Sequence, residues 1–256
     1  MLALLMLAGC AGHKGKPAAS EWDPATQKAR QFVDFLVGLN GKPLEQALDS
    51  MHTWFLRYEQ DSLMIETVNS YLYDTESPYR NEELYLPFVQ GLAASEFTPE
   101  SIRAGYADDA QMCSINRIGK AAEDFDMETL DGQRLHLYGI KADYILLMFS
   151  NPECQACDDI TEILKTDKHI LGLTESGKLA VVNMFIDEEI DVWREAALTY
   201  PESWYNCFDP IPVIRENRVY NVRAIPTLYI LDKDKKVVLK DAPFEKINAF
   251  INANIR

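Results

Sequence analysis

The stretch that decides the fold is YILLMFSNPECQAC, residues 144–157, where six apolar residues lead into two cysteines three positions apart. Residues 144–149 have the length and composition of a strand buried in the centre of a sheet. The Ser-Asn-Pro sequence at 150–152 ends that strand and predicts a tight loop. The two thiols, Cys154 and Cys157, therefore follow directly on a buried strand, a placement that suits thiol-disulfide exchange.

A helix is predicted to begin at or near Cys154, because apolar residues recur at helical spacing after it (Ile160, Ile163 and Leu164). The N-terminus of that helix would face the first sulfur. Unpaired backbone N–H groups and the helix dipole favour thiolate over thiol there, and the thiolate is the nucleophile. We therefore expect Cys154 to attack and Cys157, one turn later, to be more buried and to close the disulfide.

The C-x-x-C spacing alone leaves three interpretations open, because it also serves a structural disulfide or half of a zinc site. Further zinc ligands are not evident: Cys113 and Cys207 are isolated, and no two histidines stand at ligand spacing. We therefore predict no metal and favour redox chemistry. Cys207 lies in what reads as an aromatic loop, 204–208, and is either a buried free thiol or the partner of Cys113.

A second element lies at residues 220–232, where Pro226 opens an apolar strand that a charged turn joins to another strand at 237–239. Between the two elements, residues 179–186 predict a buried strand and 188–199 a helix. The last predicted helix covers 243–254. The predicted order is three strands, a helix, a strand, a helix, two strands and a helix.

With these elements in place, the chain resembles a thioredoxin-like domain of the TlpA/ResA type over residues 117–256. The resemblance rests on the order and spacing of four features: Gly119 through Phe125, the Asp131-Gly132 hairpin, the C-x-x-C and Ala224-Ile225-Pro226-Thr227. It implies an α/β thioredoxin-like fold, with a mixed central sheet flanked by helices.

The resemblance also implies roles for individual residues. Cys154 corresponds to the family's nucleophile, Cys157 to its resolving thiol, and Pro226 to the cis-proline beside the disulfide. The backbone of Ile225 would pair with an extended substrate segment. The redox-active disulfide Cys154–Cys157 would be the only redox group, with no separate cofactor.

The chain departs from the family's pattern at three positions. Glu153 stands where a tryptophan is common, Met148 where thioredoxins carry a buried aspartate, and Ile160 where ResA-like members carry a glutamate. The proton acceptor is therefore not assigned by the resemblance. Glu153, Asp158 and Asp159 are the candidates, and the alternative is that these acids only complement the helix dipole.

The N-terminus indicates the compartment. Residues 1–10 end in Leu-Ala-Gly-Cys and resemble the lipobox of a bacterial lipoprotein signal peptide, so Cys10 would carry lipid. Residues 11–23 would form a tether. We expect a protein anchored in the cell envelope and facing the periplasm. Its clients would be protein thiols and disulfides, and a membrane electron donor of the DsbD/CcdA kind would reduce it.

The remaining region, residues 24–115, predicts a small all-α domain of unknown function, with helices at 84–92 and after Thr98. The 256-residue chain has 25 Lys and Arg against 40 Asp and Glu, a net charge of −15, which argues against binding nucleic acid or anionic lipid. The sequence favours a thiol-disulfide oxidoreductase that reduces envelope proteins. The alternative is a non-catalytic thioredoxin-fold binding or scaffold lipoprotein.

Overall fold

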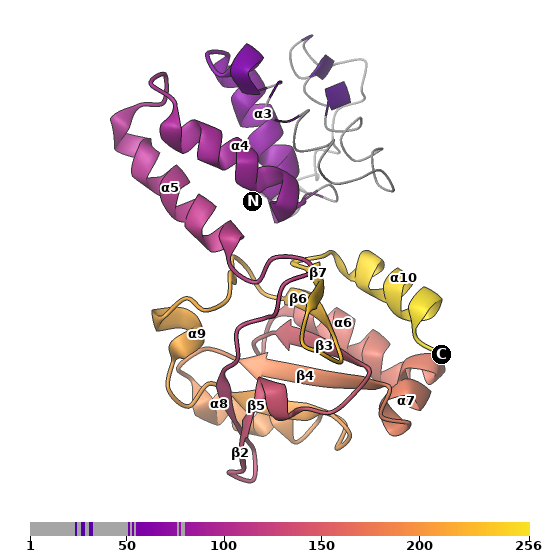
Figure 1. Ribbon diagram of the computed structural model, residues 1–256. Helices are drawn as coiled ribbons and strands as arrows, with labels where there is room; N and C mark the ends of the chain where they lie inside the picture. Colours follow the sequence, from indigo (N-terminus) through magenta and orange to yellow (C-terminus); the bar gives the residue numbers. More distant parts are fainter. Residues whose placement is uncertain are drawn as a thin grey trace, which may run out of the picture.

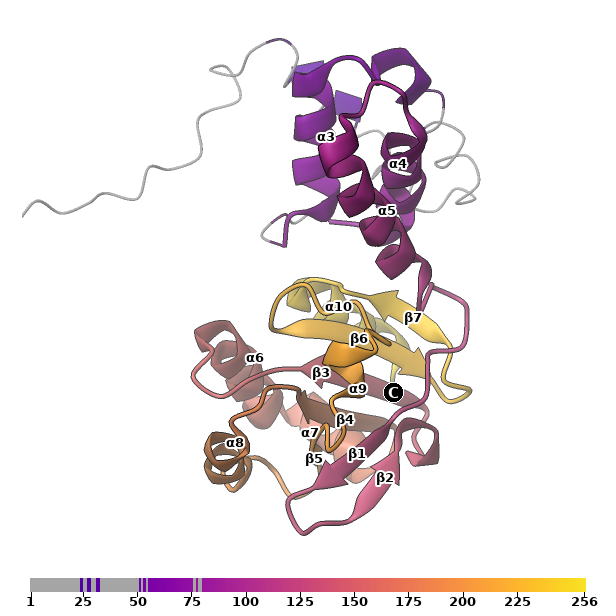
Figure 2. The same cartoon turned by 90° about the vertical axis from the view of Figure 1, so that its left-hand side faces the viewer.

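The computed structural model describes residues 24, 27, 28, 31, 32, 51, 53, 55–75, 77 and 80–256. The chain forms a helical part and an α/β part, which lie one above the other in Figures 1 and 2. The predicted signal peptide 1–10, with Cys10, and the tether 11–23 lie outside the described residues. No helix among the described residues is long and apolar enough to cross a membrane.

Three helices form the described body of the helical part: α3 (Ser62–Tyr73), α4 (Glu82–Ala94) and α5 (Glu100–Ser114). The Asp61 and Asn81 side chains accept hydrogen bonds from the Met64 and Leu84 N–H groups and so begin α3 and α4. Pro99 precedes α5. The predictions of α4 and α5 are confirmed, whereas α3 was not predicted. The helices pack around one apolar core that includes Val68, Leu72 and Phe88.

The α/β part contains a seven-stranded mixed sheet in the order β2-β1-β5-β4-β3-β6-β7. Its strands are β1 (Asp126–Thr129), β2 (Arg134–His136), β3 (Tyr144–Phe149), β4 (Leu179–Phe185), β5 (Tyr205–Phe208), β6 (Thr227–Asp232) and β7 (Val237–Lys240). β4 pairs in parallel with β3 and β5, and the other pairs are antiparallel. The predicted fold class, a mixed sheet flanked by helices, is confirmed.

Helices cover both faces of this sheet (Figure 1). They are η2 (Leu137–Gly139), α6 (Gln155–Thr166), α7 (Lys168–Glu175), α8 (Ile190–Ala197), α9 (Val213–Glu216) and α10 (Phe244–Asn254). Apolar residues of α6, α7 and α10 pack on one face, where they meet Leu146 and Val181 of the central strands. Residues of β1 and α9 belong to the core on the opposite face. The two cores hold β3 rigid up to the residue that precedes the C-x-x-C loop.

The structure corrects the prediction of a loop at 204–208. Residues 205–208 form β5, in which Cys207 lies opposite Met184 of β4 and Thr129 of β1. A four-residue strand carries little local signal, and both of its partners lie elsewhere in the chain. Cys113 and Cys207 are separate, buried free thiols, so the alternative of a disulfide between them is wrong.

A buried ionic cluster joins the helical part to the α/β part. Glu82, the first residue of α4, places its carboxylate 2.7 Å from the Lys240 ammonium and 3.5 Å from Nε of Arg223. The Arg223 guanidinium also pairs with Asp241, whose backbone oxygen accepts a hydrogen bond from Arg80 at 2.9 Å. The side chains of Glu82 and Lys240 are only 4% and 1% exposed. The contact between the two parts therefore excludes water at these charges.

A second polar group lies within the helical part, where the Asp109 carboxylate accepts hydrogen bonds from the hydroxyls of Tyr73 (3.1 Å) and Tyr85 (3.4 Å). The two tyrosine rings stack with their centroids 4.1 Å apart. Burial raises the pKa of Asp109, and the two hydroxyls oppose that rise. On the outer side of α5, Asp108 binds the Arg218 guanidinium through two hydrogen bonds of 2.7 and 2.8 Å.

Candidate active site

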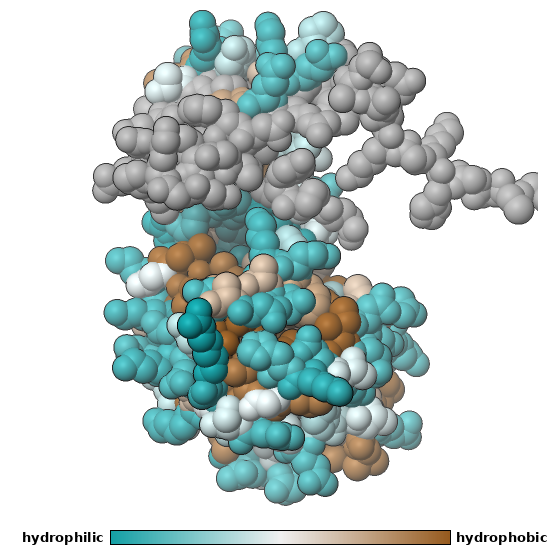
Figure 3. Space-filling view, turned by 90° about the vertical axis from the view of Figure 1, so that its right-hand side faces the viewer, coloured by the Kyte–Doolittle hydropathy of each residue, from teal (hydrophilic) through white to brown (hydrophobic). Residues whose placement is uncertain are grey.

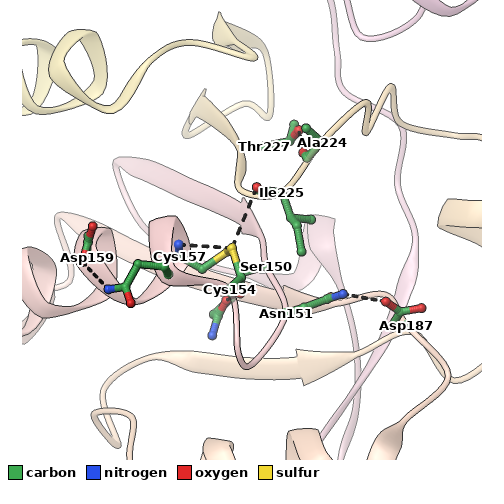
Figure 4. Close-up of a disulfide and its surroundings, with 11 residues drawn as sticks. Ser150, Asn151, Cys154, Cys157, Asp159, Asp187, Ala224, Ile225 and Thr227 are labelled. Carbon is green, nitrogen blue, oxygen red and sulfur yellow. Dashed lines mark hydrogen bonds between the residues drawn. A yellow bond between two sulfur atoms is a disulfide. The ribbon is translucent and has the colours of Figure 1, made fainter. Parts of the chain in front are cut away.

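The two cysteines of the C-x-x-C lie at the start of α6 and are joined as a disulfide (Figure 4). The Cα atoms of Cys154 and Cys157 are 5.2 Å apart. Cys154 is the N-cap of α6, and its sulfur accepts a hydrogen bond from the Cys157 N–H at 3.3 Å. The prediction that the helix begins at or near Cys154 is confirmed.

The two sulfurs differ in their access to solvent. Cys154 is half-buried, whereas Cys157 is 3% exposed and faces the core behind α6. Once the disulfide is reduced, the Cys154 sulfur stands at the positive end of the helix dipole, which favours its thiolate. Of the two sulfurs, that of Cys154 is therefore the more accessible to an incoming group.

The loop before the disulfide holds an unusual backbone conformation. Glu153 has φ of 65°, in the left-handed region that favours glycine. A non-glycine residue there costs on the order of 1 kcal/mol, and such residues cluster at functional sites. The loop turns the chain sharply between β3 and α6, so that Cys154 comes to the end of the sheet.

The segment before β6 lies against the disulfide. The Ile225–Pro226 peptide bond is cis, and the Ile225 carbonyl oxygen is 3.9 Å from the Cys154 sulfur. The Thr227 hydroxyl donates to the Ala224 carbonyl at 2.6 Å and so fixes the turn (Figure 4). β3 and β6 are antiparallel neighbours, in which Phe149 lies opposite Thr227. This pairing brings two segments 71 residues apart together at the sulfur.

Two polar pairs that sequence reasoning missed stabilise the loops around the disulfide. The buried Ser150 hydroxyl donates to the Asn183 side chain at 2.5 Å, and the Asn151 amide donates to Asp187 at 2.6 Å. Arg215 also binds Asp187, at 2.6 Å. A signal for the second pair exists in the sequence, since Asn151 and Asp187 each follow shortly after a buried strand. The neighbouring parallel strands β3 and β4 bring such residues to one edge.

The three candidate proton acceptors are all exposed. Glu153 lies in the loop, while Asp158 and Asp159 lie in the first turns of α6. The Asp159 carboxylate accepts a hydrogen bond from the Gln155 amide at 2.8 Å. Met148, at the position where thioredoxins carry a buried aspartate, is fully buried and lies opposite Asn183 of β4. The polar neighbour of Met148 in β4 is therefore an uncharged amide.

Other functional groups are sparse in the described part of the chain. It contains no cluster of three or more His, Cys, Asp or Glu side chains that would hold a metal ion. Burial raises the pKa of the Cys207 thiol to about 12 and raises that of Cys113 further. Neither of these two free thiols is therefore prepared for nucleophilic chemistry.

Sequence comparison finds a protein similar to the α/β part of this chain. The chain is 26% identical over 138 residues to the thiol-disulfide oxidoreductase ResA of Bacillus cereus, a match that covers 53% of this chain and 73% of ResA. No family model matches the chain.

Two solved structures extend the comparison. A thioredoxin-like protein from Bacteroides caccae ATCC 43185 is 33% identical with a TM-score of 0.83, covering 93% of this chain and 87% of that protein. The C-terminal domain of an uncharacterized protein from Bacteroides fragilis NCTC 9343 is 39% identical with a TM-score of 0.51, covering 54% of this chain and 98% of that domain. The first match includes the helical part as well as the sheet.

Proposed function

The chain belongs to the thioredoxin-like proteins of the ResA/TlpA type, a family of thiol-disulfide oxidoreductases, and from this we propose that it reduces disulfides of envelope proteins through Cys154 and Cys157. One observation carries the proposal: the half-buried Cys154 sulfur caps α6 and lies 3.9 Å from the Ile225 carbonyl oxygen. An extended client segment paired with the Ile225 backbone would place its own disulfide against that sulfur.

The proposed reaction has two exchange steps. In the reduced protein, the Cys154 thiolate attacks one client sulfur, a mixed disulfide forms and the other client sulfur leaves as a thiolate. The Cys157 thiolate then attacks the Cys154 sulfur and releases the client. The client has gained two electrons and two protons, and the protein holds the Cys154–Cys157 disulfide. A membrane electron donor of the DsbD/CcdA kind would restore the dithiol.

The charges near the disulfide favour the direction of a reductase. Glu153, Asp158 and Asp159 add negative charge around Cys154 and oppose the helix dipole, so they disfavour the thiolate. A strong oxidant such as DsbA depends on a stabilised reduced form with a very low thiol pKa. We therefore propose a potential closer to that of thioredoxin, about −270 mV, than to that of DsbA, about −120 mV.

Placement in the envelope is a further part of the proposal. Cys10 would be lipidated and would hold the protein at a membrane with the disulfide facing the periplasm. The support is the lipobox-like sequence at residues 7–10. In that oxidising compartment, a dithiol persists only where a partner supplies electrons.

The test compares serine variants of the two cysteines in an insulin reduction assay. Cys154→Ser should abolish turnover, whereas Cys157→Ser should accumulate mixed disulfides that a reducing agent releases. Equal residual turnover in both variants would contradict the assignment. A wild-type protein without turnover, whose Cys154 reacts no faster than free cysteine, would instead support the non-catalytic scaffold alternative.

A further inference from the structure

A hollow of about 720 Å³ opens beside Asn151 and Ile225, between the helical part and the α/β part. On the α/β side its wall includes Asn151, Asp187 and Ile225, which belong to the loops around the C-x-x-C. The helical part supplies the opposite wall through Tyr73, Asp109 and Met112. This hollow next to the Ile225 segment is therefore bounded by both parts of the chain.

A second hollow, of about 690 Å³, also borders the segment that precedes β6. Its floor comes from α6 and the start of α10, with Ile160, Ile163 and Phe244 among its apolar residues. The helical part again contributes to the wall, here with Thr75, Ser77 and Arg80 from the region between α3 and α4. Hydrophobic residues gather on the α/β part just below the helical part in the space-filling view (Figure 3).

The two hollows share Ala224 and Ile225. The Ile225 carbonyl is the group 3.9 Å from the Cys154 sulfur, so both hollows border the backbone segment that lies against the sulfur. No backbone hydrogen bond within the described part of the chain uses the Ile225 N–H. A strand lying along the segment could accept a hydrogen bond from that N–H group.

Arg223 and Arg80 form direct contacts between the helical part and the α/β part next to this segment. The Arg223 guanidinium lies over the Tyr73 ring, 3.9 Å from its centroid, and hydrogen-bonds the Tyr73 carbonyl. Arg80 donates to the carbonyls of Thr75 (2.6 Å) and Asp241 (2.9 Å). Arg223 precedes the cis peptide bond by only two residues. These contacts therefore hold Tyr73 and Arg80 close to the segment that precedes β6 and to Asp241.

We propose that the helical part forms one wall of the client-binding site, and that the occupant is an extended segment of a protein with residues entering both hollows. This inference rests on the function proposed above and adds a role for the helical part in selecting the substrate. A small disulfide covers only the space at the sulfur. A polypeptide strand continues in both directions, with its side chains alternating between its two sides. The contacts in the hollows therefore favour protein disulfides over small ones.

The test places a large side chain in the second hollow from the helical side. Thr75→Trp should lower the ratio of kcat/KM for insulin to kcat/KM for a small aromatic disulfide by about tenfold, equivalent to about 1.4 kcal/mol. The matched control is Thr53→Trp, at an exposed helical threonine that lines neither hollow, and its ratio should equal that of the wild type. An unchanged ratio in Thr75→Trp, or an equal fall of both rates, would overturn the proposal.

A second measurement needs no substitution in the wall. A Cys157→Ala protein is trapped as a mixed disulfide with a cysteine-containing peptide or with glutathione, and backbone hydrogen exchange is compared. The peptide should slow exchange in the α3–α4 region and at the end of α5, and glutathione should not. Equal exchange in both adducts would overturn the inference. Failure of the wild-type protein to reduce either disulfide would instead overturn the proposed function.

Discussion

Replacing Glu82 by glutamine should strongly destabilise the protein, because Glu82 is the anion at the centre of the contact between the two parts. Its side chain is 4% exposed, and it faces Lys240 at 2.7 Å and Arg223 at 3.5 Å. Glutamine keeps the size and can still accept the hydrogen bond that the Asn221 amide donates to Glu82. What it removes is the negative charge. Lys240 then loses its carboxylate partner, while Arg223 still pairs with Asp241.

The magnitude follows from the burial of the partners. Removing one member of a buried ion pair costs about 3–5 kcal/mol, since the remaining charge stays desolvated. The charge also lies in the first turn of α4, where interaction with the helix dipole adds about 0.3–1 kcal/mol. For a chain of this size each kcal/mol lowers Tm by about 2–4 °C, so a 3–5 kcal/mol loss lowers it by about 6–20 °C.

Urea unfolding followed by circular dichroism measures the loss. The matched control is Glu162→Gln, because Glu162 is 67% exposed and pairs with Lys165 at 3.2 Å on the surface of α6. That exposed pair should contribute less than about 1 kcal/mol. A double variant, Glu82→Met with Lys240→Met, should recover much of the loss, since the unpaired ammonium is gone. A loss below about 1 kcal/mol in Glu82→Gln, or a double variant no more stable than it, would refute the reasoning.

Three further results are expected. Burial raises the pKa of Asp109, so the stability that this group contributes is present below its unfolded pKa of about 3.9 and is lost as pH rises through the folded pKa. Asp109→Asn should remove that decline. Unfolding free energies of the wild type and the variant, measured between about pH 3 and 7, test this. In a Cys10→Ala protein with an intact disulfide, Cys113 and Cys207 should react with a thiol reagent only after denaturant is added. Both thiols are buried, and burial raises the pKa of Cys207 to about 12. Rapid labelling of the native protein would contradict their burial. Detergent partitioning should be lost in Cys10→Ala, and partitioning that persists without Cys10 would reject the lipid anchor.

Several features of the fold could be predicted from the sequence because their physical cause is local. The apolar run at 144–149 could be read as a central strand, and the cysteine spacing with its following apolar residues placed the start of α6. Pro99 and the residues after it marked α5 in the same way. In each case the residues that set the structure lie within a few positions of it, so composition and spacing are sufficient.

Other features depended on partners distant in the chain. The strand β5 exists because residues 205–208 pair with β4 and β1, and nothing in those four residues distinguishes them from an aromatic loop. The cluster of Glu82, Arg223 and Lys240 joins positions up to 158 residues apart, and each looks like an ordinary surface charge in the sequence. Burial decides their importance, and burial is a property of the packed molecule.

The candidate site divides in the same way. The sequence by itself determined which two cysteines form the C-x-x-C and which proline begins the facing strand, because spacing along the chain controls a helix start and a strand start. Only the tertiary structure decided that Tyr73, Thr75 and Arg80 of the helical part border the free space beside Ile225. Long-range contacts form when buried charges and apolar faces find their complements, and no local pattern records which complement they meet.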